Sequence, residues 1–394
     1  MRLPLIPTLI LLLLALAVDF FIFRHLRRKG SPQWLRRAYI AVAVLTQGAL
    51  VYAAVMPKKS GSDQALTVLM WILFVYLSCY VSKIVYALFV LLRTGLQRLF
   101  HRPMRPVEVC GAVLGIAVFG LMWWGALVNR FRLDVRETDV TVPTLPAAFN
   151  GLRIVQISDI HTGTYGTDTT FLSRMVDRVN ALEPDIILFT GDIVNRHSDE
   201  LRPFTGVLSR LSAPLGVWGV MGNHDYGDYY NWENETAHRA DADSLKALET
   251  RAGIRMLNNS HVWLRAGNDS IALIGVENIG DPPFPVYGSI DEAYPDIADS
   301  HFKILLSHNP AHWCDSISDK PDANIALTLA GHTHAMQVEL AGFSPASWRY
   351  PAWGGLYTDS LGRHLYVNIG LGTVAMPARI GATPEITVLN LNNR

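Results

Sequence analysis

The stretch LRIVQISDIH, residues 152–161, shows the arrangement that decides the fold of the second half of the chain. A short apolar run ends in Asp159 and His161, and four further runs also end in Asp, Asn or His. These are DIILFTGD (185–192), VWGVMGNHD (217–225), FKILLSHNP (302–310) and IALTLAGHTH (325–334). Short apolar runs are typical of buried strands, and α/β folds place the residues that follow their strands at one edge of the sheet. The sequence therefore predicts one site built from five strand ends.

The side chains expected at this edge are carboxylate, imidazole and amide groups, which together suit a pair of divalent metal ions. Asp192 is expected to bridge the pair, with its two oxygens facing different ions, and Gly191 allows the backbone to turn closely. Asp159 and His161 are two residues apart, so both side chains point to one side of an extended backbone. Mn²⁺, Fe²⁺ and Zn²⁺ all fit donors of this kind.

The rest of the second half predicts two packed sheets with flanking helices. Residues 168–182 place apolar side chains on one helical face, and the strand at 185–190 follows directly, as in a βαβ unit. We also expect a short helix at 244–251 and strands at 271–276, 366–369 and 385–391.

The first part of the chain is strongly apolar. Residues 3–23, 38–56, 65–92 and 107–127 are long enough to cross a bilayer, which needs about 20 residues per helix. We therefore expect a four-helix transmembrane region at 1–129, a linker at 130–150 and a catalytic domain at 151–394. Asp19 lies near the end of the first span and is expected to reach the membrane interface.

Basic residues predict the orientation in a multi-pass cell (inner) membrane. They are concentrated in the first and third loops, at Arg24, Arg27, Arg28, Lys29, Arg36 and Arg37 and at Arg93, Arg98, Arg102 and Arg105. Positive loops stay in the cytoplasm, so the second half is expected on the extracytoplasmic side. A cleaved signal peptide is the alternative for the first span, and the apolar run to Phe23 argues against it.

The charge balance bears on the partners. Lys plus Arg and Asp plus Glu each number 34, so no excess of positive charge favours nucleic acid. The three cysteines do not form a disulfide framework. The expected partners are the lipid bilayer and a small or lipid-linked substrate.

The ordered set of motifs resembles the signature of the calcineurin-like metallophosphoesterases. It consists of Asp159-Ile160-His161, Gly191-Asp192, Gly222-Asn223-His224-Asp225, His308 and Gly331-His332-Thr333-His334. The tail, with Gly370-Leu371-Gly372-Thr373 and Pro384-Glu385-Ile386, resembles the bacterial membrane-associated branch of that family. The resemblance implies a four-layer α/β/β/α sandwich, preceded here by four transmembrane helices.

The resemblance also implies roles for the residues. One metal ion would be held by Asp159, His161 and His334, the other by Asn223, His308 and His332, with Asp192 bridging. His224 would stabilise or protonate the leaving oxygen, Asp225 would orient His224, and a hydroxide held by the metals would be the nucleophile. The sequence departs from the family where Ala335-Met336 stand in place of the small glycines after the last histidine.

Arg379 remains open between two interpretations. A guanidinium matches phosphate oxygens in a two-pronged fashion, so Arg379 is a candidate phosphate clamp. A surface or structural salt bridge is the alternative. The aromatic segments 225–232 and 343–357 each follow a ligand motif and are expected near the mouth of the site, as loop packing or as a wall for a lipid.

The favoured function is a membrane-anchored, metal-dependent phosphoesterase that hydrolyses phosphodiester or pyrophosphate bonds of a lipid-linked or envelope substrate. One alternative is a phosphomonoesterase that acts on proteins or small molecules. Another is a signalling or scaffold protein that binds metal without turnover.

Overall fold

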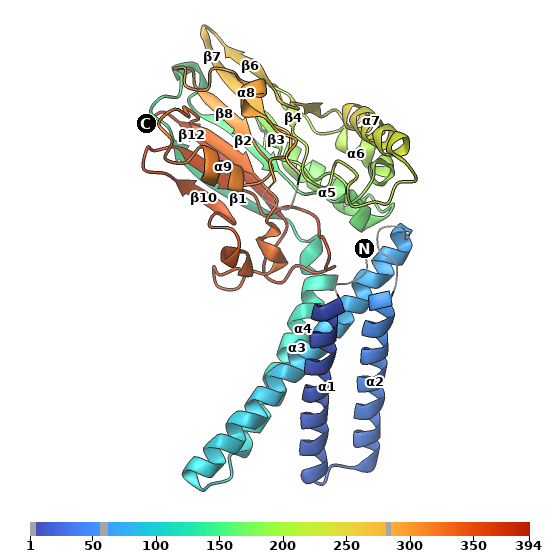
Figure 1. Ribbon diagram of the computed structural model, residues 1–394. Helices are drawn as coiled ribbons and strands as arrows, with labels where there is room; N and C mark the ends of the chain where they lie inside the picture. Colours follow the sequence, from blue (N-terminus) through green and yellow to red (C-terminus); the bar gives the residue numbers. More distant parts are fainter. Residues whose placement is uncertain (1–4, 56–61, 281–284) are drawn as a thin grey trace. The chain divides into compact units, whose positions relative to one another are not determined.

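A computed structural model describes residues 5–55, 62–280 and 285–394 of the chain (Figure 1). The chain divides into two compact units. The first comprises residues 1–128 with 375–378, and the second comprises residues 129–374 with 379–394. We describe each unit by itself.

The first unit consists of four long helices, which are α1 (Leu5–Arg28), α2 (Gln33–Val55), α3 (Asp63–Phe100) and α4 (Arg105–Leu127). Each of them is long and apolar enough to cross a membrane, and many of their large apolar side chains face outward. This confirms the four spans predicted from the sequence, apart from residues 3, 4 and 56, which lie outside the described residues. The helices extend beyond the apolar runs because the basic flanks also favour helix.

From the sequence we expected Asp19 to reach the membrane interface, and the structure places it differently. Its side chain is buried inside the first unit, where Oδ1 lies 2.8 Å from Nζ of Lys83. Tyr80 and Tyr39 donate hydrogen bonds of 2.5 and 2.7 Å to the same carboxylate. The acid is therefore retained within the bundle by a base and two hydroxyl groups, since a buried charge must be paired and hydrogen-bonded.

The second unit contains two six-stranded sheets. The first has the order β1 (Asp134–Thr141), β12 (Glu385–Asn392), β2 (Leu152–Ile157), β3 (Ile186–Phe189), β4 (Val217–Gly219) and β5 (Arg255–Met256). The second has the order β10 (Gly355–Thr358), β11 (His364–Val367), β9 (Leu327–Ala330), β8 (Lys303–Leu306), β7 (Asp269–Gly275) and β6 (Ser260–Ala266). In both sheets the strands that precede the polar motifs pair in parallel, so their carboxyl ends lie at the same edge.

The two sheets pack face to face, with helices on both outer faces. One apolar cluster joins side chains of the two inner faces, including Ile154 and Leu188 of the first sheet and Leu273 and Leu329 of the second. On the outside of the first sheet lie α5 (Thr170–Asn180), α6 (Thr205–Leu208) and α7 (Glu235–Arg251). On the outside of the second lie α8 (Ile290–Ala293) and α9 (Ala311–Ser316). The predicted four-layer α/β/β/α sandwich is confirmed.

Several predicted elements need new limits. The helix expected at 168–182 is α5, and the short helix expected at 244–251 is the end of the longer α7, which begins at the cap Asn234. Short 3₁₀ segments connect the larger elements: η1 (Asn129–Phe131), η2 (Ala147–Phe149), η3 (Thr162–Tyr165), η4 (Ser198–Phe204), η5 (His334–Gln337) and η6 (Pro345–Trp348).

The stretch 130–150, expected as a linker, contains a strand of the core. β1 pairs in parallel with β12 along its whole length, from Asp134 beside Glu385 to Thr141 beside Asn392. Its sequence, DVRETDVT, is polar because β1 is an edge strand with only Val140 buried. An edge strand can satisfy its hydrogen bonds without an apolar pattern, so its residues carry no apolar alternation that predicts a strand.

Candidate metal centre

The polar motifs that follow β2, β3, β4, β8 and β9 come together at one edge of the sandwich. One group of donors consists of Asp159, His161, Asp192 and His334, which are all buried and whose ligand atoms lie within 4.8 Å of one another. The Nε2 atoms of His161 and His334 are 3.0 Å apart. Oδ1 of Asp159 lies 3.2 Å from Nε2 of His334. Four side chains from three separate segments thus point at one small volume.

A second group of donors lies beside the first. Oδ1 of Asn223 lies 2.9 Å from Nδ1 of His332 and 3.2 Å from Nε2 of His308. The two imidazole nitrogens are 3.3 Å apart. These three atoms form a compact triangle of oxygen and nitrogen donors.

Asp192 connects the two groups through a single oxygen. Its Oδ2 lies 3.6 Å from Nε2 of His161 in the first group and 3.3 Å from Nε2 of His308 in the second. Its Oδ1 instead accepts a hydrogen bond of 2.8 Å from the backbone N–H of His224. The sequence analysis expected the two oxygens to face different ions, whereas the geometry places one oxygen between both groups.

The spacing of these donors fits divalent metal ions. Ligand atoms bound at about 2.0–2.2 Å around one ion lie roughly 3.0–3.5 Å from each other. The contacts within each group are 2.9–3.3 Å, close to this range. Each of these atoms can give a lone pair to a cation once any proton on it has been displaced. The donors suit Mn²⁺, Fe²⁺ or Zn²⁺, and they do not discriminate among these.

Each of the four histidines is held by its second ring nitrogen. Nδ1 of His308 lies 2.7 Å from the carbonyl oxygen of Thr190, and Nδ1 of His161 lies 3.2 Å from that of Val194. Nε2 of His332 lies 3.0 Å from the hydroxyl of Tyr350. Such outer contacts fix the ring orientation and are typical of ligating histidines.

Charge and burial shift the pKa values of this cluster in opposite directions. Burial opposes ionisation of Asp159, but the imidazole of His334 holds the pKa of that carboxyl below its usual range. Burial likewise disfavours the charged ring of His308, yet the carboxylate of Asp192 raises its pKa to about 9. Burial and the positive charge of His308 lower the pKa of His332 to about 3. Protons on His308 therefore compete with any cation for the same lone pair.

The backbone at the ligands is strained. Five of the seven candidate ligands have positive φ angles, namely Asp159 at 50°, His161 at 49°, Asp192 at 60°, His332 at 72° and His334 at 50°. This conformation costs a non-glycine residue roughly 1–2 kcal/mol and persists only where the surrounding structure enforces it. The residues therefore bend out of their strand ends at the positions where their side chains converge.

Close packing around these bends explains two of the glycines. A Cβ atom at Gly331 would lie 2.0 Å from Oγ of Ser158 and 2.3 Å from Oδ2 of Asp159. Gly191 has a φ of 96°, and a Cβ there would lie 2.5 Å from the backbone nitrogen of Gly222. Only glycine leaves room for the facing motif in both places.

His224 lies beside the first group with its ring edge-on to His161, at a centroid distance of 4.9 Å. Its Nδ1 lies 2.7 Å from the carbonyl oxygen of Asn195. Because a carbonyl only accepts, Nδ1 carries the proton and Nε2 is the acceptor in the neutral ring. The ring of Tyr229 stacks on it at 4.2 Å, and the Tyr229 hydroxyl accepts a hydrogen bond from Asn223.

From the sequence we expected Asp225 to orient His224, but the structure shows different contacts for its side chain. Its carboxylate accepts hydrogen bonds from the backbone N–H groups of Asp192, Ile193, Val194 and Gly222. Burial and the nearby Asp192 raise the pKa of Asp225 to about 7, against the effect of these donors. Asp225 therefore shapes the loop that carries Asp192. The backbone carbonyl of Asn195 orients His224, the role that was expected of Asp225.

Arg379 is not placed as a phosphate clamp. Its side chain is fully buried, and it donates hydrogen bonds to the carbonyl oxygens of Ile369, Gly372 and Ala382. Its Nη2 also lies 3.0 Å from Nδ1 of His334. Burial lowers the pKa of Arg379 to about 10. The guanidinium supports His334 from behind, and with these contacts it is neither a phosphate clamp nor a surface salt bridge.

Sequence reasoning missed three residues that contact this site. Tyr229 and Tyr350 lie in the aromatic segments that were expected near the mouth, and their side chains contact Asn223 and His332. That composition was a usable signal for the segments, although not for the individual residues. Asn195 acts through its backbone carbonyl, which any residue possesses, so no sequence pattern could have identified it.

Comparisons with known proteins agree with this geometry. Residues 152–336 match the family described as calcineurin-like phosphoesterase, and residues 1–130 match the probable calcineurin-like phosphoesterase transmembrane domain. The metallophosphoesterase YkuE of Bacillus subtilis (strain 168) is 31% identical over 75% of this chain and 98% of its own length. The chain belongs to the calcineurin-like phosphoesterases, and it is a multi-pass membrane metallophosphoesterase.

Two further relatives also have informative names. The transmembrane protein with metallophosphoesterase domain of Danio rerio is 31% identical over 70% of this chain and 61% of its own length. The UDP-2,3-diacylglucosamine pyrophosphatase LpxG of Chlamydia muridarum (strain MoPn / Nigg) is 28% identical over 68% of this chain and 92% of its own length. The similarity therefore extends to both bacterial and vertebrate proteins.

Proposed function

We propose that this protein hydrolyses a phosphodiester or pyrophosphate bond of a lipid-linked or envelope substrate at a centre of two divalent ions. Asp159, His161 and His334 hold one ion, Asn223, His308 and His332 hold the other, and Asp192 lies between them. The observation that carries the proposal is the position of Oδ2 of Asp192, which is 3.6 Å from His161 and 3.3 Å from His308.

The proposed chemistry divides between the ions and His224. Two divalent ions would polarise the phosphoryl group and lower the pKa of water. In the proposal, His224 acts as the doubly protonated ring: Nδ1–H stays on the carbonyl of Asn195 at 2.7 Å, and Nε2–H gives its proton to the leaving oxygen. Tyr229 holds the ring in place by stacking on it.

An exposed apolar surface beside the metal centre supports a lipid-linked substrate. It is formed by Met336, Leu340, Phe343 and Trp348, which are 44, 51, 50 and 80% exposed. Phe343 and Trp348 contact each other edge-to-face at 5.9 Å. The segment begins directly after His334 and ends beside Tyr350, which contacts His332. Large exposed apolar side chains in one segment are typical of surfaces that meet lipid or partners.

The relatives support the same substrate class. LpxG is named a pyrophosphatase of UDP-2,3-diacylglucosamine, a compound in which acyl chains and a pyrophosphate occur together. A protein that combines a phosphoesterase centre with membrane helices is suited to a substrate that stays in the bilayer. We therefore favour a bond in a lipid-linked compound over one in a soluble metabolite or a phosphoprotein.

In the proposal the catalytic unit faces the extracytoplasmic side of the cell membrane. The support is the distribution of basic residues, which lie mainly at the helix ends next to the α1–α2 and α3–α4 connections and within these connections. A reporter that is active only outside the cytoplasm, fused at Arg394, tests this. Activity is the expected result, and signal from a cytoplasm-specific reporter at the same position would reverse the orientation.

Hydrolysis of synthetic esters tests the reaction. The full-length protein with Mn²⁺ is expected to cleave an aryl phosphodiester faster than the corresponding monoester, and Asp192→Ala and His224→Ala to abolish both rates. A faster monoester rate would favour a phosphomonoesterase. Metal bound at full occupancy without any cleavage would indicate a binding protein.

The role of the apolar surface is tested with two substrates in parallel. Trp348→Ser together with Phe343→Ser is expected to slow hydrolysis of a pyrophosphate-linked lipid in vesicles and to leave the soluble aryl diester rate unchanged. Leu361→Ser, which removes another exposed apolar side chain away from this segment, is the control. Equal slowing of both substrates would show that the surface serves the fold rather than the lipid.

A further inference from the structure

The first unit contains a basic pocket between α1 and α3. Its volume is about 490 Å³, and its lining includes Phe20, Arg24 and Arg28 from α1 and Leu91, Gly95 and Arg98 from α3. These positions are three or four residues apart along each helix, so each set lies on one helical face. The volume is within the range of small-molecule sites, about 300–1,000 Å³.

Three arginines of this pocket differ from the basic residues near them, which are paired with a carboxylate. Glu108, near the start of α4, lies 2.7 Å from Nζ of Lys29 and 2.6 Å from Nη1 of Arg93. It also contacts His25 at 3.1 Å. In contrast, Arg24, Arg28 and Arg98 are exposed and have no carboxylate partner among the residues that the structure describes.

The sequence offers these arginines no other acid within the first unit. Residues 1–128 contain three acidic residues, Asp19, Asp63 and Glu108. Asp19 is paired with Lys83, and Asp63 begins α3, at the opposite end of that helix from Arg98. The positive charge of the pocket is therefore left for an external anion.

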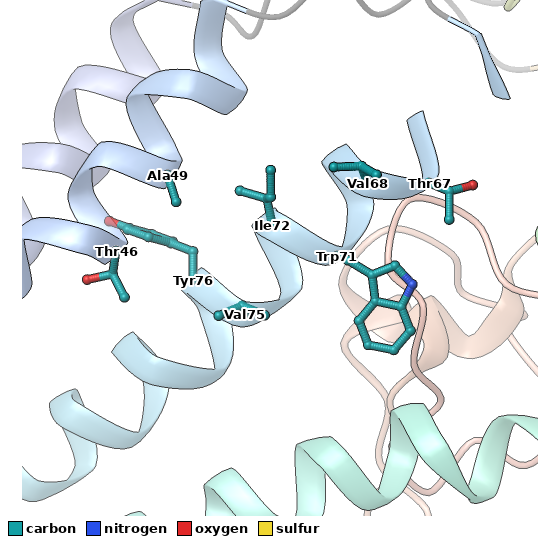
Figure 2. A pocket seen from close by; sticks show the side chains of 8 residues that line it. All are labelled: Thr46, Ala49, Thr67, Val68, Trp71, Ile72, Val75 and Tyr76. Carbon is teal, nitrogen blue, oxygen red and sulfur yellow. The ribbon is translucent and has the colours of Figure 1, made fainter. Parts of the chain in front are cut away.

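The walls of the pocket indicate an anion with apolar chains. Phe20 and Leu91 are 65 and 52% exposed, and they lie on helices that cross the membrane by length and composition. A second pocket lies nearer the start of α3 (Figure 2). It is also apolar but has no charged lining residue, and its lining includes Val68, Trp71, Ile72 and Tyr76. The basic pocket thus has apolar side chains on membrane-crossing helices, as the second pocket does, and in addition three guanidinium groups.

We propose that this pocket binds the phosphate headgroup of an anionic phospholipid. Arg24, Arg28 and Arg98 contact the phosphate, because guanidinium groups match phosphate oxygens in a two-pronged fashion, and Phe20 and Leu91 lie along the acyl chains. The space beside Gly95 is open to the headgroup, since a Cβ there would meet nothing within 4 Å. The lipid belongs to the leaflet at the end of the bundle where α4 begins, and the site is separate from the proposed metal centre.

Native mass spectrometry of the full-length protein in mild detergent tests the proposal. With equal amounts of phosphatidylglycerol and phosphatidylcholine, the wild type is expected to retain phosphatidylglycerol. The triple variant Arg24→Gln, Arg28→Gln, Arg98→Gln is expected to lose this preference, with affinity reduced roughly a hundredfold at about fivefold per arginine.

A matched variant separates a pocket from general charge attraction. Arg37→Gln, Arg102→Gln, Arg105→Gln removes the same charge from exposed arginines of the same connections that do not line the pocket. Lipid retention is expected to stay at the wild-type level. Equal loss in both variants, or no loss in either, would overturn the proposal.

Filling the pocket provides a test that leaves every charge in place. Gly95→Leu has room for its side chain and is a better helix former, so the variant is expected to fold and to lose phosphatidylglycerol. Undiminished retention in this variant would overturn the proposal. Inorganic phosphate at millimolar concentration is expected not to displace the lipid, and complete displacement would show that the ligand is free phosphate rather than a lipid headgroup.

Discussion

The two units of this protein both bury charged and polar side chains, and they satisfy them in different ways. In the membrane unit, the carboxylate of Glu108 lies 2.6 Å from Arg93 and 2.7 Å from Lys29, and that of Asp19 lies 2.8 Å from Lys83. In the catalytic unit, nitrogen and oxygen donors face one another at 2.9–3.3 Å. The first arrangement pairs opposite charges directly, whereas the second gathers atoms that can each give a lone pair to a cation.

The backbone conformation around these polar clusters also differs between the two units. Apart from Lys29, which follows α1, the paired charges of the membrane unit lie within regular helices. Five of the seven candidate ligands lie at positive φ, where a non-glycine residue is strained. A cluster that stabilises the fold can thus be built on relaxed backbone, while a cluster that serves a ligand is held in place at some cost in stability.

Asp192→Asn is expected to break this comparison with the largest effect. The amide has nearly the same size but no negative charge, so the two groups of donors lose the anion between them. We expect hydrolysis of an aryl diester to fall by more than about a thousandfold, with less metal bound by elemental analysis and little change in thermal stability.

Asp243→Asn is the control for this substitution, because Asp243 is exposed in α7 and outside the metal centre. Its rate and metal content are expected to match the wild type. Wild-type turnover in Asp192→Asn would contradict the assignment of the metal centre.

Glu108→Gln is expected to lower the stability and leave metal binding unchanged, the reverse of Asp192→Asn. It leaves Arg93, Lys29 and His25 without their shared carboxylate, which we expect to destabilise the membrane unit by about 1–3 kcal/mol. Thermal unfolding in detergent measures this loss, while the metal content per chain is expected to stay unchanged. Glu235→Gln removes an exposed pair with Arg239 and is expected to cost less than about 0.5 kcal/mol. Equal effects of the two substitutions would remove the distinction between the clusters.

A pH series sharpens the role of His308. Its pKa is raised to about 9, so below that pH its ring is protonated and a metal ion must displace the proton. Metal affinity is therefore expected to rise with pH between 6.5 and 8.5, by up to about tenfold per unit. Isothermal titration calorimetry with Mn²⁺ measures it, and an affinity that falls as pH rises would contradict the pairing of His308 with Asp192.

The smallest expected effect concerns strain after the last ligand. Met336 has a φ of 46° and is 44% exposed, so Met336→Gly relieves strain and loses little packing. We expect a gain of about 0.5–1 kcal/mol in the free energy of unfolding. Ala240→Gly, in the regular helix α7, is the control and is expected to lose about 1 kcal/mol. The same sign in both variants would show that the left-handed turn is not strained.

The sequence made the ligands predictable because each follows a buried parallel strand. Strands of this kind are apolar throughout, so their ends are visible as a change to Asp, Asn or His. The glycines before Asp192 and His332 marked where the backbone passes close to the facing motif. Local pattern and site geometry coincide there, and that is why the predicted motifs meet in the structure.

The failures concern contacts that depend on distant parts of the chain. Arg379 is buried by the loops around it, and only the fold shows that its donors are used by carbonyl groups. Asp225 is adjacent to His224 in sequence, but its carboxylate points to the loop of Asp192. Adjacency along the chain does not decide which neighbour a side chain meets, since His224 and Asp225 lie in a turn and contact different groups.

The order of strands in the first sheet has a consequence for biogenesis. β12 lies between β1 and β2, parallel to one and antiparallel to the other. All the other strands of both sheets are synthesised after β1 and before β12. β1 and β2 therefore stay unpaired on facing edges until β12 has been synthesised, and such edges invite aggregation. Closure of the catalytic sandwich is a late event in the life of the polypeptide, and a chaperone that shields these edges would act within that interval.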